Sequence, residues 1–477
     1  MREMVATRSF DDADQHWFAK VSGDVNPMHM DAGGAAATQA GERVVHGVHA
    51  VLWALERLAR QGSSLAELKQ LKVKFSKFIT LGKVASLVVI DGKPQELRAE
   101  IDVEGAPGAV SLRLSFGGAR KPGAEDMLRK DGLPDLSAGP IERDIGDFAE
   151  AHGRLTIPAG AEAEIVSVFP RLSEIWSPAT VAHIGLMSTV VGMVTPGLHS
   201  IFSDFTLTFK DDGEAASDFY FSTTRFDPRF RLATIRACCS AFESTIAAYL
   251  RYPPVAPPRF CDIERSIPRD QFLGRVALVV GGSRGIGAVV SQAIAAGGGR
   301  VVATYAANES AARAIQADVR AHRPAGSFEI CQFDSTNPSE ISASDSFTDL
   351  FYFATPKIFD QSSEVFSVAR HDAFCKVYLQ GFHDLVMSLL KDRTLPLKVF
   401  YPSSVAVTDR PKSMTEYAMA KAAGEILCQD LAKAHPLLNI EIHRLPRVMT
   451  DQTATVPPVA APSALEAILP LLIETTG

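Results

Sequence analysis

The stretch RVALVVGGSRGIGAVVSQAIAAGGGRVVATY, residues 275–305, constrains the fold of this chain more than any other. Two β-branched runs flank a glycine turn and an apolar segment long enough for a helix. A strand, a turn, a helix and a second strand in this order form a βαβ unit with parallel strands. Further strand candidates alternate with helical segments at 349–355, 397–404 and 439–445. Residues 268–477 are therefore predicted to be an α/β domain, a doubly wound parallel sheet with helices on both faces.

The glycine turn indicates a dinucleotide site, because it directly follows a predicted strand and begins a helix. Glycines let the backbone approach a pyrophosphate, whose charge the helix N-terminus stabilises. The predicted cofactor-binding residues of the turn are Gly281, Ser283, Arg284, Gly285, Ile286 and Gly287.

Three side chains farther along form an ordered set. Ser404 lies thirteen residues before Tyr417, and Lys421 follows Tyr417 at position i+4. On one helix face Tyr417 and Lys421 would be neighbours, so the ammonium can lower the pKa of the phenol and prepare it to give or take a proton. Because this pair alone is common on solvated helix faces, the prediction rests on the whole set.

With the glycine turn, this set resembles the short-chain dehydrogenase/reductases, and VALVVGGSRGIG with VVATYAANESAARAI most resembles their 3-ketoacyl-thioester reductases, over about 270–460. The resemblance implies a Rossmann-type domain in which Tyr417 is the general acid. Lys421 would be its electrostatic partner and a ribose ligand, and Ser404 a hydrogen-bond donor to the substrate carbonyl.

The cofactor is predicted to be NADPH/NADP rather than NADH. The second strand ends VVATYAANE, with no acidic residue at its tip for the adenosine ribose, and Arg284 lies where a 2'-phosphate would bind. Asp334, in QFDSTNP, matches the position that borders adenine in this family. Its alternative is a simple turn aspartate.

The sequence also departs from this family. Phe353 begins an F-A-T-P stretch in place of the usual N-N-A-G, and Tyr378 replaces the helix asparagine. Only a short segment separates Pro338 from Leu350, and no seventh strand is apparent before Gly477. We expect an altered proton relay. The reductase site would then be relaxed or completed by a partner, or the domain would bind its cofactor without turnover.

The N-terminal half contains a repeat, in which one apolar helix precedes alternating strands. The segments are 46–59, 71–82, 84–91 and 109–116, then 182–194, 198–209, 219–226 and 232–239. This pattern favours a helix wrapped by a curved antiparallel sheet, and two such units could pair as a pseudo-dimer. Linkers at 117–140 and at the proline-rich 251–260 delimit domains at 1–120 and 138–252.

The first of these domains carries FAKVSGDVNPMHMD at 18–31, followed by His46-Gly47 at the start of its helix. Over roughly the first 120 residues it resembles the MaoC-like (R)-specific enoyl-thioester hydratases, whose signature is S-G-D-x-N-P-x-H with a later H-G. The resemblance implies an α+β double hot-dog. The second domain lacks the D-x-x-P-x-H pattern before His183, so it is predicted to be non-catalytic and to complete an acyl-chain tunnel.

The chemistry of hydration explains these residue types. A base must take a proton from water and an acid must protonate C2, so Asp24 and His29 could hold one water between them. The N–H of Gly47, at a helix N-terminus, could donate a hydrogen bond to the thioester oxygen and stabilise the negative charge that develops there. No metal is required. The alternative is that Asp24 builds an Asx-type turn and His29 is a satisfied histidine; for His46 a structural and a catalytic role stay open.

Composition narrows the partners and the location. A net charge of −7 without a basic block gives no footprint for nucleic acid or an anionic membrane. The N-terminus lacks the apolar stretch of a secretory signal, and no run approaches the ~18 apolar residues of a membrane span. The six cysteines form no C-x-x-C pair, so buried free thiols are expected. A cytoplasmic homo-oligomer with small or carrier-bound substrates is expected.

The first hypothesis is therefore a bifunctional enzyme. One site reduces a 3-ketoacyl thioester of coenzyme A or an acyl carrier protein with NADPH, and the other interconverts the (R)-3-hydroxyacyl and trans-2-enoyl thioesters. A second hypothesis is a reductase of another carbonyl with an acyl-binding hot-dog module. A third is a non-catalytic component that binds acyl carriers within a biosynthetic assembly.

Overall fold

The computed structural model describes residues 2–36, 38–93, 95–103, 106–117, 132–148, 151–210, 218–253, 257–306, 308–324, 326–336, 347–356, 358, 365–450, 453 and 461–474. The chain divides between residues 253 and 254 into two compact units. Most of the linker expected at 117–140 and most of the short segment before Leu350 lie outside the described residues.

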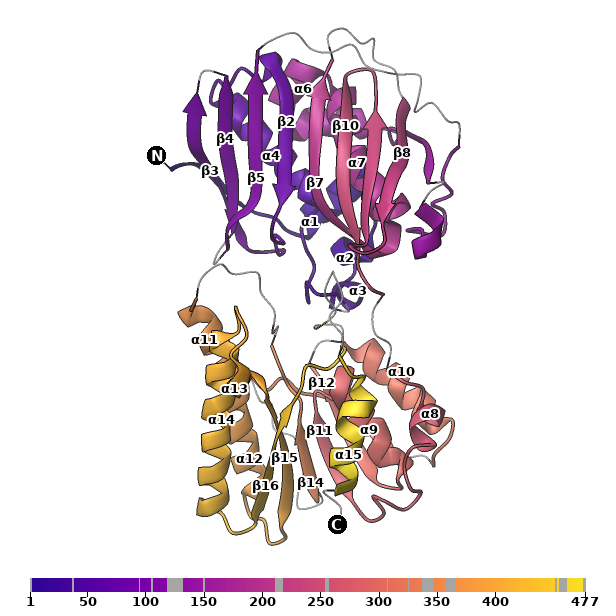
Figure 1. The fold of residues 1–477 in the computed structure, drawn as a ribbon, viewed down its shortest axis with the longest axis vertical. Helices are drawn as coiled ribbons and strands as arrows, with labels where there is room; N and C mark the ends of the chain where they lie inside the picture. Colours follow the sequence, from indigo (N-terminus) through magenta and orange to yellow (C-terminus); the bar gives the residue numbers. More distant parts are fainter. Residues whose placement is uncertain are drawn as a thin grey trace. The chain divides into compact units, whose positions relative to one another are not determined.

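The first unit is a ten-stranded antiparallel sheet packed on helices (Figure 1). The strands are β1 (Glu3–Ser9), β2 (Leu68–Phe75), β3 (Val84–Lys93), β4 (Glu96–Val103), β5 (Ala106–Phe116), β6 (His152–Thr156), β7 (Ser200–Phe209), β8 (Asp218–Asp227), β9 (Leu232–Cys238) and β10 (Phe242–Leu250). The α-helices are α1 (Asp12–Ser22), α2 (Pro27–Met30), α3 (Ala32–Ala36), α4 (Gly47–Arg60), α5 (Ala161–Val168), α6 (Pro170–Trp176) and α7 (Pro178–Thr189).

The strand order in this sheet is β1-β3-β4-β5-β2-β7-β10-β9-β8-β6. Counted outward from the central β2–β7 pair, the two halves have the same connectivity, and in each a long helix, α4 or α7, precedes the central strand. The halves meet where Leu71 pairs with Leu207 and Val73 with Phe205. A single hydrophobic core runs through both halves, because α4 and α7 lie against the same continuous sheet.

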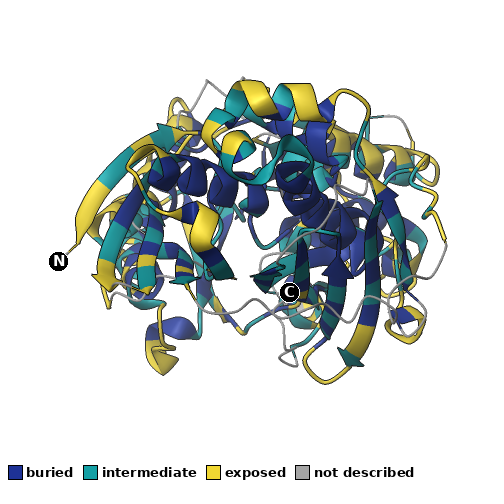
Figure 2. Ribbon diagram, turned by 90° about the horizontal axis from the view of Figure 1, so that it is seen from above, coloured by how far each residue is buried: buried dark blue, intermediate teal, exposed yellow. Residues whose placement is uncertain are grey.

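The helices of this core are enclosed while the sheet margins are exposed. Along α4 all but three residues are buried, and along α7 all but two. The strand β1, beside the N label in Figure 2, is exposed or intermediate along its whole length. In the described parts no single helix is long and apolar enough to span a membrane; by length and composition only the bent pair formed by α6 with 178–194 passes.

Two sequence expectations for this unit were wrong. The strand expected at 71–82 ends at Phe75, because 76–82 turn away and Gly82 adopts a positive φ. The helix expected at 182–194 is α-helical only to Thr189 and continues as a π-helical turn, Val190–Val194.

The second unit is a six-stranded parallel sheet in the order β13-β12-β11-β14-β15-β16. Its strands are β11 (Val276–Val280), β12 (Arg300–Tyr305), β13 (Phe328–Gln332), β14 (Asp349–Tyr352), β15 (Leu397–Ser404) and β16 (Leu438–Leu445). Its helices are α8 (Phe260–Glu264), α9 (Gly285–Ala296), α10 (Glu309–Arg320), α11 (Val368–Cys375), a π-helical turn (Lys376–Gly381), α12 (Phe382–Leu390), α13 (Ala406–Asp409), α14 (Thr415–Ala434) and α15 (Ala464–Glu474).

Helices cover both faces of this sheet, as the alternating pattern predicted (Figure 1). One core contains apolar residues of α9 and α15, and the other contains those of α12 and α14. Because parallel strands end at a common edge, the segments after β11, β14 and β15 lie together there. A Cβ on Gly281, after β11, would lie 3.0 Å from the backbone of Phe353, after β14.

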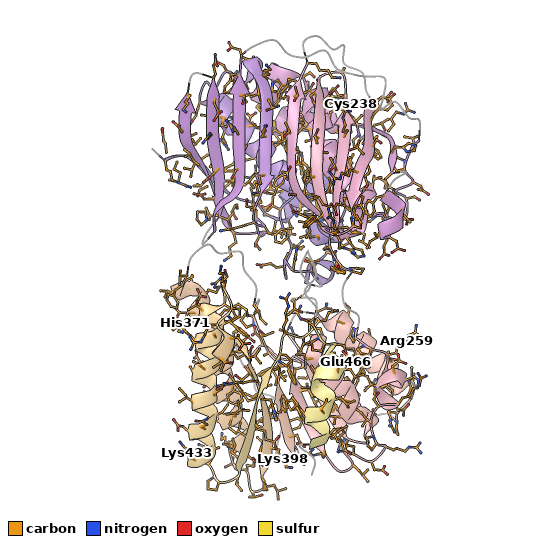
Figure 3. All side chains as sticks on the ribbon, in the orientation of Figure 1. Cys238, Arg259, His371, Lys398, Lys433 and Glu466 are labelled. Carbon is orange, nitrogen blue, oxygen red and sulfur yellow. The ribbon has the colours of Figure 1, made fainter. Side chains whose placement is uncertain are left out.

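All six cysteines are free thiols. Cys238, on β9 (Figure 3), Cys239 and Cys428 are buried, and the other three are partly exposed. The expectation of free thiols is confirmed, whereas burial holds for half of them.

Candidate active sites

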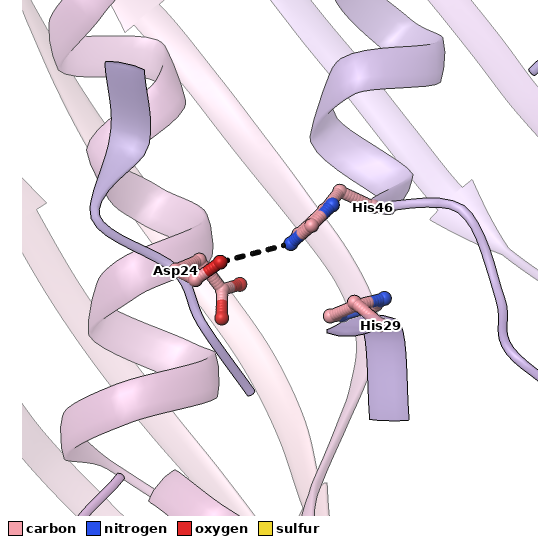
Figure 4. A group of neighbouring side chains, drawn as sticks. All are labelled: Asp24, His29 and His46. Atoms are coloured by element: carbon pink, nitrogen blue, oxygen red, sulfur yellow. Dashed lines mark hydrogen bonds between the residues drawn. The ribbon is translucent and has the colours of Figure 1, made fainter. Parts of the chain in front are cut away.

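The first candidate site lies where the loop after α1 meets the N-termini of α2 and α4. Asp24 is 1% exposed, and the rings of His29 and His46 stack beside it with centroids 4.0 Å apart (Figure 4). One polar atom from each of the three side chains lies within 4.8 Å of the others. Two hydrogen bonds of about 2.8 Å span distances up to this limit, so one water could bridge Asp24 and His29.

The local sequence dictates this arrangement. Gly23 ends α1 with a φ of 80°, which only glycine adopts without strain. Asn26 caps α2 through its side-chain oxygen, which accepts from Met28 N at 3.0 Å, and Pro27 occupies the first helical position. The D-x-N-P-x-H spacing thus places His29 on a capped turn facing Asp24.

The hydrogen bond of His29 fixes its tautomer. Nδ1 lies 2.8 Å from the carbonyl oxygen of Val44, which can only accept, so Nδ1 carries the proton. The other ring nitrogen, Nε2, then has a free lone pair when the ring is neutral. His29 can therefore take a proton from a bound water.

His46 holds the backbone beside the reacting groups. Its Nε2 donates to the carbonyl oxygen of Asp24 at 3.1 Å, the dashed line in Figure 4. Burial lowers the pKa of His46 well below its usual value, and His29 adds to this effect. A metal ion bound at this nitrogen would have to displace the contact with Asp24. In this geometry His46 positions Asp24.

Gln15 is a buried residue of α1 that the sequence reasoning missed. Its Nε2 donates to the carbonyl oxygens of His29 (3.0 Å) and Val44 (2.9 Å), and its Oε1 lies 3.3 Å from His46 Nδ1. Gln15 therefore links the turn that carries His29 to the carbonyl oxygen of Val44, which orients the His29 ring. A polar residue on the buried face of α1 was the only sequence signal.

Gly47 begins α4, whose N-cap residue makes no side-chain capping bond. The first intrahelical bond at this end goes from Ala50 N to His46 O, and the described residues supply no acceptor for the N–H of Gly47. A Cβ at Gly47 would lie 2.7 Å from the Phe75 ring, so a larger residue would require that ring to shift. This free N–H at a helix N-terminus suits a developing oxyanion.

The second candidate site begins at the glycine turn after β11. Gly281 and Gly285 have φ values of 76° and 53°, and a Cβ on Gly287 would overlap the carbonyl oxygen of Gly281. Ser283 is buried, whereas Arg284 is exposed at the N-cap of α9. Since Ala288 makes the first intrahelical bond, the N–H groups of Ile286 and Gly287 have no acceptor among the described residues. The turn therefore fits a dinucleotide pyrophosphate.

The predicted triad meets at the same edge of this sheet. Ser404 ends β15, and Tyr417 and Lys421 lie one turn apart on α14. A hydrogen bond with Ser404 lowers the pKa of Tyr417, but burial outweighs it and the net shift is upward. The expected lowering of this pKa by Lys421 is therefore not found.

Lys421 is 6% exposed and makes an unexpected set of contacts. Its Nζ donates to Pro402 O at 2.6 Å and lies 3.8 Å from the centroid of the Tyr378 ring. Burial lowers the pKa of Lys421 to about 7, whereas the carbonyl and the ring face both favour the cation. Tyr378 thus lies beside Lys421, at the position where the family asparagine was expected.

The hydroxyl of Tyr378 hydrogen bonds to Thr355, another departure from the family pattern. The backbone oxygen of Tyr378 accepts from Tyr401 Oη at 3.1 Å. Both departures therefore belong to one connected group of side chains next to Lys421. Asp334 is exposed and caps an Asx turn, accepting from Thr336 N and Oγ1 at 2.8 Å each.

Comparison with known proteins agrees with this division. Residues 2–110 match a family model described as a MaoC like domain, and residues 275–347 match one described as short chain dehydrogenase. The chain is a fusion of a MaoC-like domain and a short-chain dehydrogenase domain. In the fusion, Asp24, His29 and Gly47 lie within the MaoC-like match and the glycine turn lies within the dehydrogenase match.

Curated relatives of the fusion match only short stretches. An acetoacetyl-CoA reductase from Shinella zoogloeoides is 54% identical over 46 residues, 10% of this chain and 19% of that protein. One from Paracoccus denitrificans is 57% identical over 43 residues, 9% of this chain and 18% of that protein. The chain thus spans about a fifth of the length of these relatives.

Solved structures similar to the fusion cover one part each. A MaoC-like dehydratase is 12% identical and covers 52% of this chain and 97% of its own, with a TM-score of 0.37. A short chain dehydrogenase from Burkholderia cenocepacia in complex with NADP is 22% identical and covers 43% and 92%, also with a TM-score of 0.37.

Proposed function

We propose that this fusion is a bifunctional enzyme of acyl-thioester metabolism. Its dehydrogenase domain reduces a 3-ketoacyl thioester with NADPH to the (R)-3-hydroxyacyl thioester, and its MaoC-like part dehydrates that product to the trans-2-enoyl thioester or catalyses the reverse. We infer that the two halves of the first unit are hot-dog domains at 1–120 and 138–252, followed by a Rossmann-type domain at 268–477. The proposed substrate carrier is coenzyme A or an acyl carrier protein, in the cytoplasm.

In hydration, Asp24 and His29 hold the attacking water. One O–H bond of the water breaks as its oxygen bonds to C3, and the proton passes to this pair. The electron pair of the C2–C3 double bond shifts toward the thioester, where the N–H of Gly47 stabilises the charge on oxygen. C2 then receives a proton from the same pair, so both new bonds form on one face and no external reactant is needed.

In reduction, NADPH held by the glycine turn after β11 and by Lys421 would supply the hydride that C3 of the substrate receives. Tyr417 gives its phenolic proton to the carbonyl oxygen, and Ser404 donates a hydrogen bond to the same oxygen. Lys421 stabilises the resulting tyrosinate and holds the ribose. Arg284 lies exposed at the N-cap of α9, where it could pair with a 2'-phosphate, which favours NADPH.

One observation supports the proposal most strongly. Within each unit, side chains that one resemblance names lie together, with polar atoms of Asp24 and His29 within 4.8 Å of each other and Ser404 near enough to Tyr417 to influence its pKa. Both chemistries act at C3 of an acyl thioester, so the product of one site is the substrate of the other.

The test separates the two sites in the full chain. NADPH oxidation with a 3-ketobutyryl thioester should be lost in Tyr417→Phe and kept in Asp24→Asn. Hydration of a crotonyl thioester should be lost in Asp24→Asn and kept in Tyr417→Phe. The assignment would be contradicted if one variant lost both activities. It would also be contradicted if neither variant lost any activity.

A second candidate is a dehydrogenase domain that binds the cofactor without turnover. The observation that favours it is Tyr378, which replaces the family's helix asparagine, packs on Lys421 and hydrogen bonds to Thr355. NADPH binding, seen as a change in its fluorescence, with no oxidation by coenzyme A or carrier-protein substrates would support this candidate. Turnover that depends on Tyr417 would exclude it.

A further inference from the structure

The loop that carries Asp24, residues 22–26, is in contact with the second half of the first unit. Residues 188–193, at the end of α7 and in the π-helical turn, contact residues 22–26. Thr189 Oγ1 donates to the carbonyl oxygen of Ser22, and Val25 N lies 3.3 Å from Met193 Sδ. Asn26 Nδ2 donates to Gly192 O at 2.7 Å.

Gly192 lies in the last turn of this helix, where backbone carbonyl groups have no helical partner. Its carbonyl group is therefore available to accept from Asn26. A Cβ on Gly192 would lie 2.7 Å from both carboxylate oxygens of Asp24. The carboxylate therefore rests against the bare Cα of Gly192.

Among the described residues, Ser188 makes the one side-chain hydrogen bond to this carboxylate. Its Oγ donates to Asp24 Oδ2 at 2.6 Å, and Asn26 N donates to Asp24 Oδ1 at 3.1 Å. Both Ser188 and Asp24 are buried, at 5% and 1% exposure. A short hydrogen bond from a buried hydroxyl to a carboxylate is among the stronger kinds in proteins.

We propose that Ser188, although it lies in the half without a catalytic motif, is a positioning residue that orients the carboxylate of Asp24 toward the water it shares with His29. This rests on the proposed hydratase function. The non-catalytic half then has a role in the reaction beyond packing.

The electrostatics of the site agree with this role. Burial raises the pKa of Asp24, whereas His29, the hydrogen bond from Ser188 and the N–H of Asn26 all oppose that rise. The titratable side chains that face Asp24 are His29 and His46, from α2 and α4. In α7 and its π-helical turn the one titratable residue is His183, which stacks on Phe219 instead.

Ser188→Ala is the direct test. Without the donor the pKa of Asp24 should rise further, so the acid limb of the kcat/KM profile for crotonyl-CoA hydration should move to higher pH. The rate on the plateau should fall by roughly tenfold or more, the usual effect of losing a hydrogen bond to a charged group. Ser188→Thr, which keeps a hydroxyl, should restore both, and Ser188→Cys, a weaker donor, should lie between them.

Thr189→Val is the matched control, because that hydroxyl bonds the backbone of Ser22 and not the carboxylate. It should leave the acid limb unchanged. Tryptophan fluorescence in the same samples reports that the first unit is folded, because all three tryptophans lie in it. An acid limb in Ser188→Ala equal to that of the wild type, or equal shifts in Thr189→Val, would overturn the proposal. Full hydration by Asp24→Asn would instead refute the proposed hydratase function itself.

Discussion

Asn26→Asp should destabilise the first unit although it changes only an amide to a carboxylate. The Asn26 side chain accepts from Met28 N and donates to Gly192 O at 2.7 Å, with longer contacts to Gly197 O and Leu198 O. The carboxylate keeps the cap of α2 but has no donor for these carbonyl groups. The side chain is 3% exposed, so water cannot replace the lost bond.

The magnitude follows from these contacts. A buried carbonyl left without its donor costs about 1–3 kcal/mol, and a buried charge that faces carbonyl oxygens adds to this. We expect a total of about 3–5 kcal/mol near neutral pH, a large fraction of the ~5–15 kcal/mol that stabilises a typical domain. Asn26→Ser, which keeps a capping oxygen without adding charge, should cost less.

Urea unfolding followed by tryptophan fluorescence measures this in the full chain. All three tryptophans, Trp17, Trp53 and Trp176, lie in the first unit, so the signal reports that unit alone. In the folded state the new carboxyl has a raised pKa, so the variant loses stability as pH rises through that pKa. Its deficit should narrow on acidification, when the protonated group can donate to Gly192 O. A variant within about 0.5 kcal/mol of the wild type at neutral pH, typical of a neutral surface substitution, would refute the reasoning.

Three further outcomes are expected. Gly287→Ala should abolish NADPH binding, measured by fluorescence titration, and leave hydration intact, because the added Cβ overlaps Gly281 O; unchanged binding would show that the turn is not the cofactor site. Burial lowers the pKa of Lys421 from 10.5 to about 7, so the unfolded chain binds more protons between these values and the stability of the second unit should rise with pH across that window; thermal unfolding by circular dichroism should show this rise in the wild type and not in Lys421→Met. Hydration should survive dialysis against a chelator, since the chemistry assigned to Asp24 and His29 uses no metal, and a loss restored by added Zn²⁺ would contradict it.

Local patterns predicted much of the fold. The β-branched runs and the glycine turn at 275–305 indicated β11, α9 and β12, and the helical period at 46–59 indicated α4. Four strands of the first sheet were missed, β4 and β10 in its interior and β1 and β6 at its margins. The marginal strands are short, and each pairs with a strand far away in sequence, as Ser9 does with Val84. Short strands of mixed polarity give a weak periodic signal.

The motif residues could be identified from the sequence, but the side chains that hold them in position could not. Asp24 and His29 were visible in one segment, whereas Ser188 lies 164 residues from the carboxylate it contacts. Its one local signal is a Ser-Thr pair inside the apolar run HIGLMSTVVGMV. No spacing rule predicts such a contact, because it depends on how two halves pack. The same holds for Tyr378, which the family pattern identified as a departure without showing that it covers Lys421.

The most direct test of the two-site account follows one deuterium through both reactions. The full chain would be given a 3-ketobutyryl thioester and NADPH deuterated at the transferred position, and the products analysed by mass spectrometry. The account predicts a hydroxyacyl and an enoyl thioester that both carry deuterium at C3, with Asp24→Asn stopping at the labelled hydroxyacyl product and Tyr417→Phe forming neither. Absence of deuterium from every acyl product would contradict it.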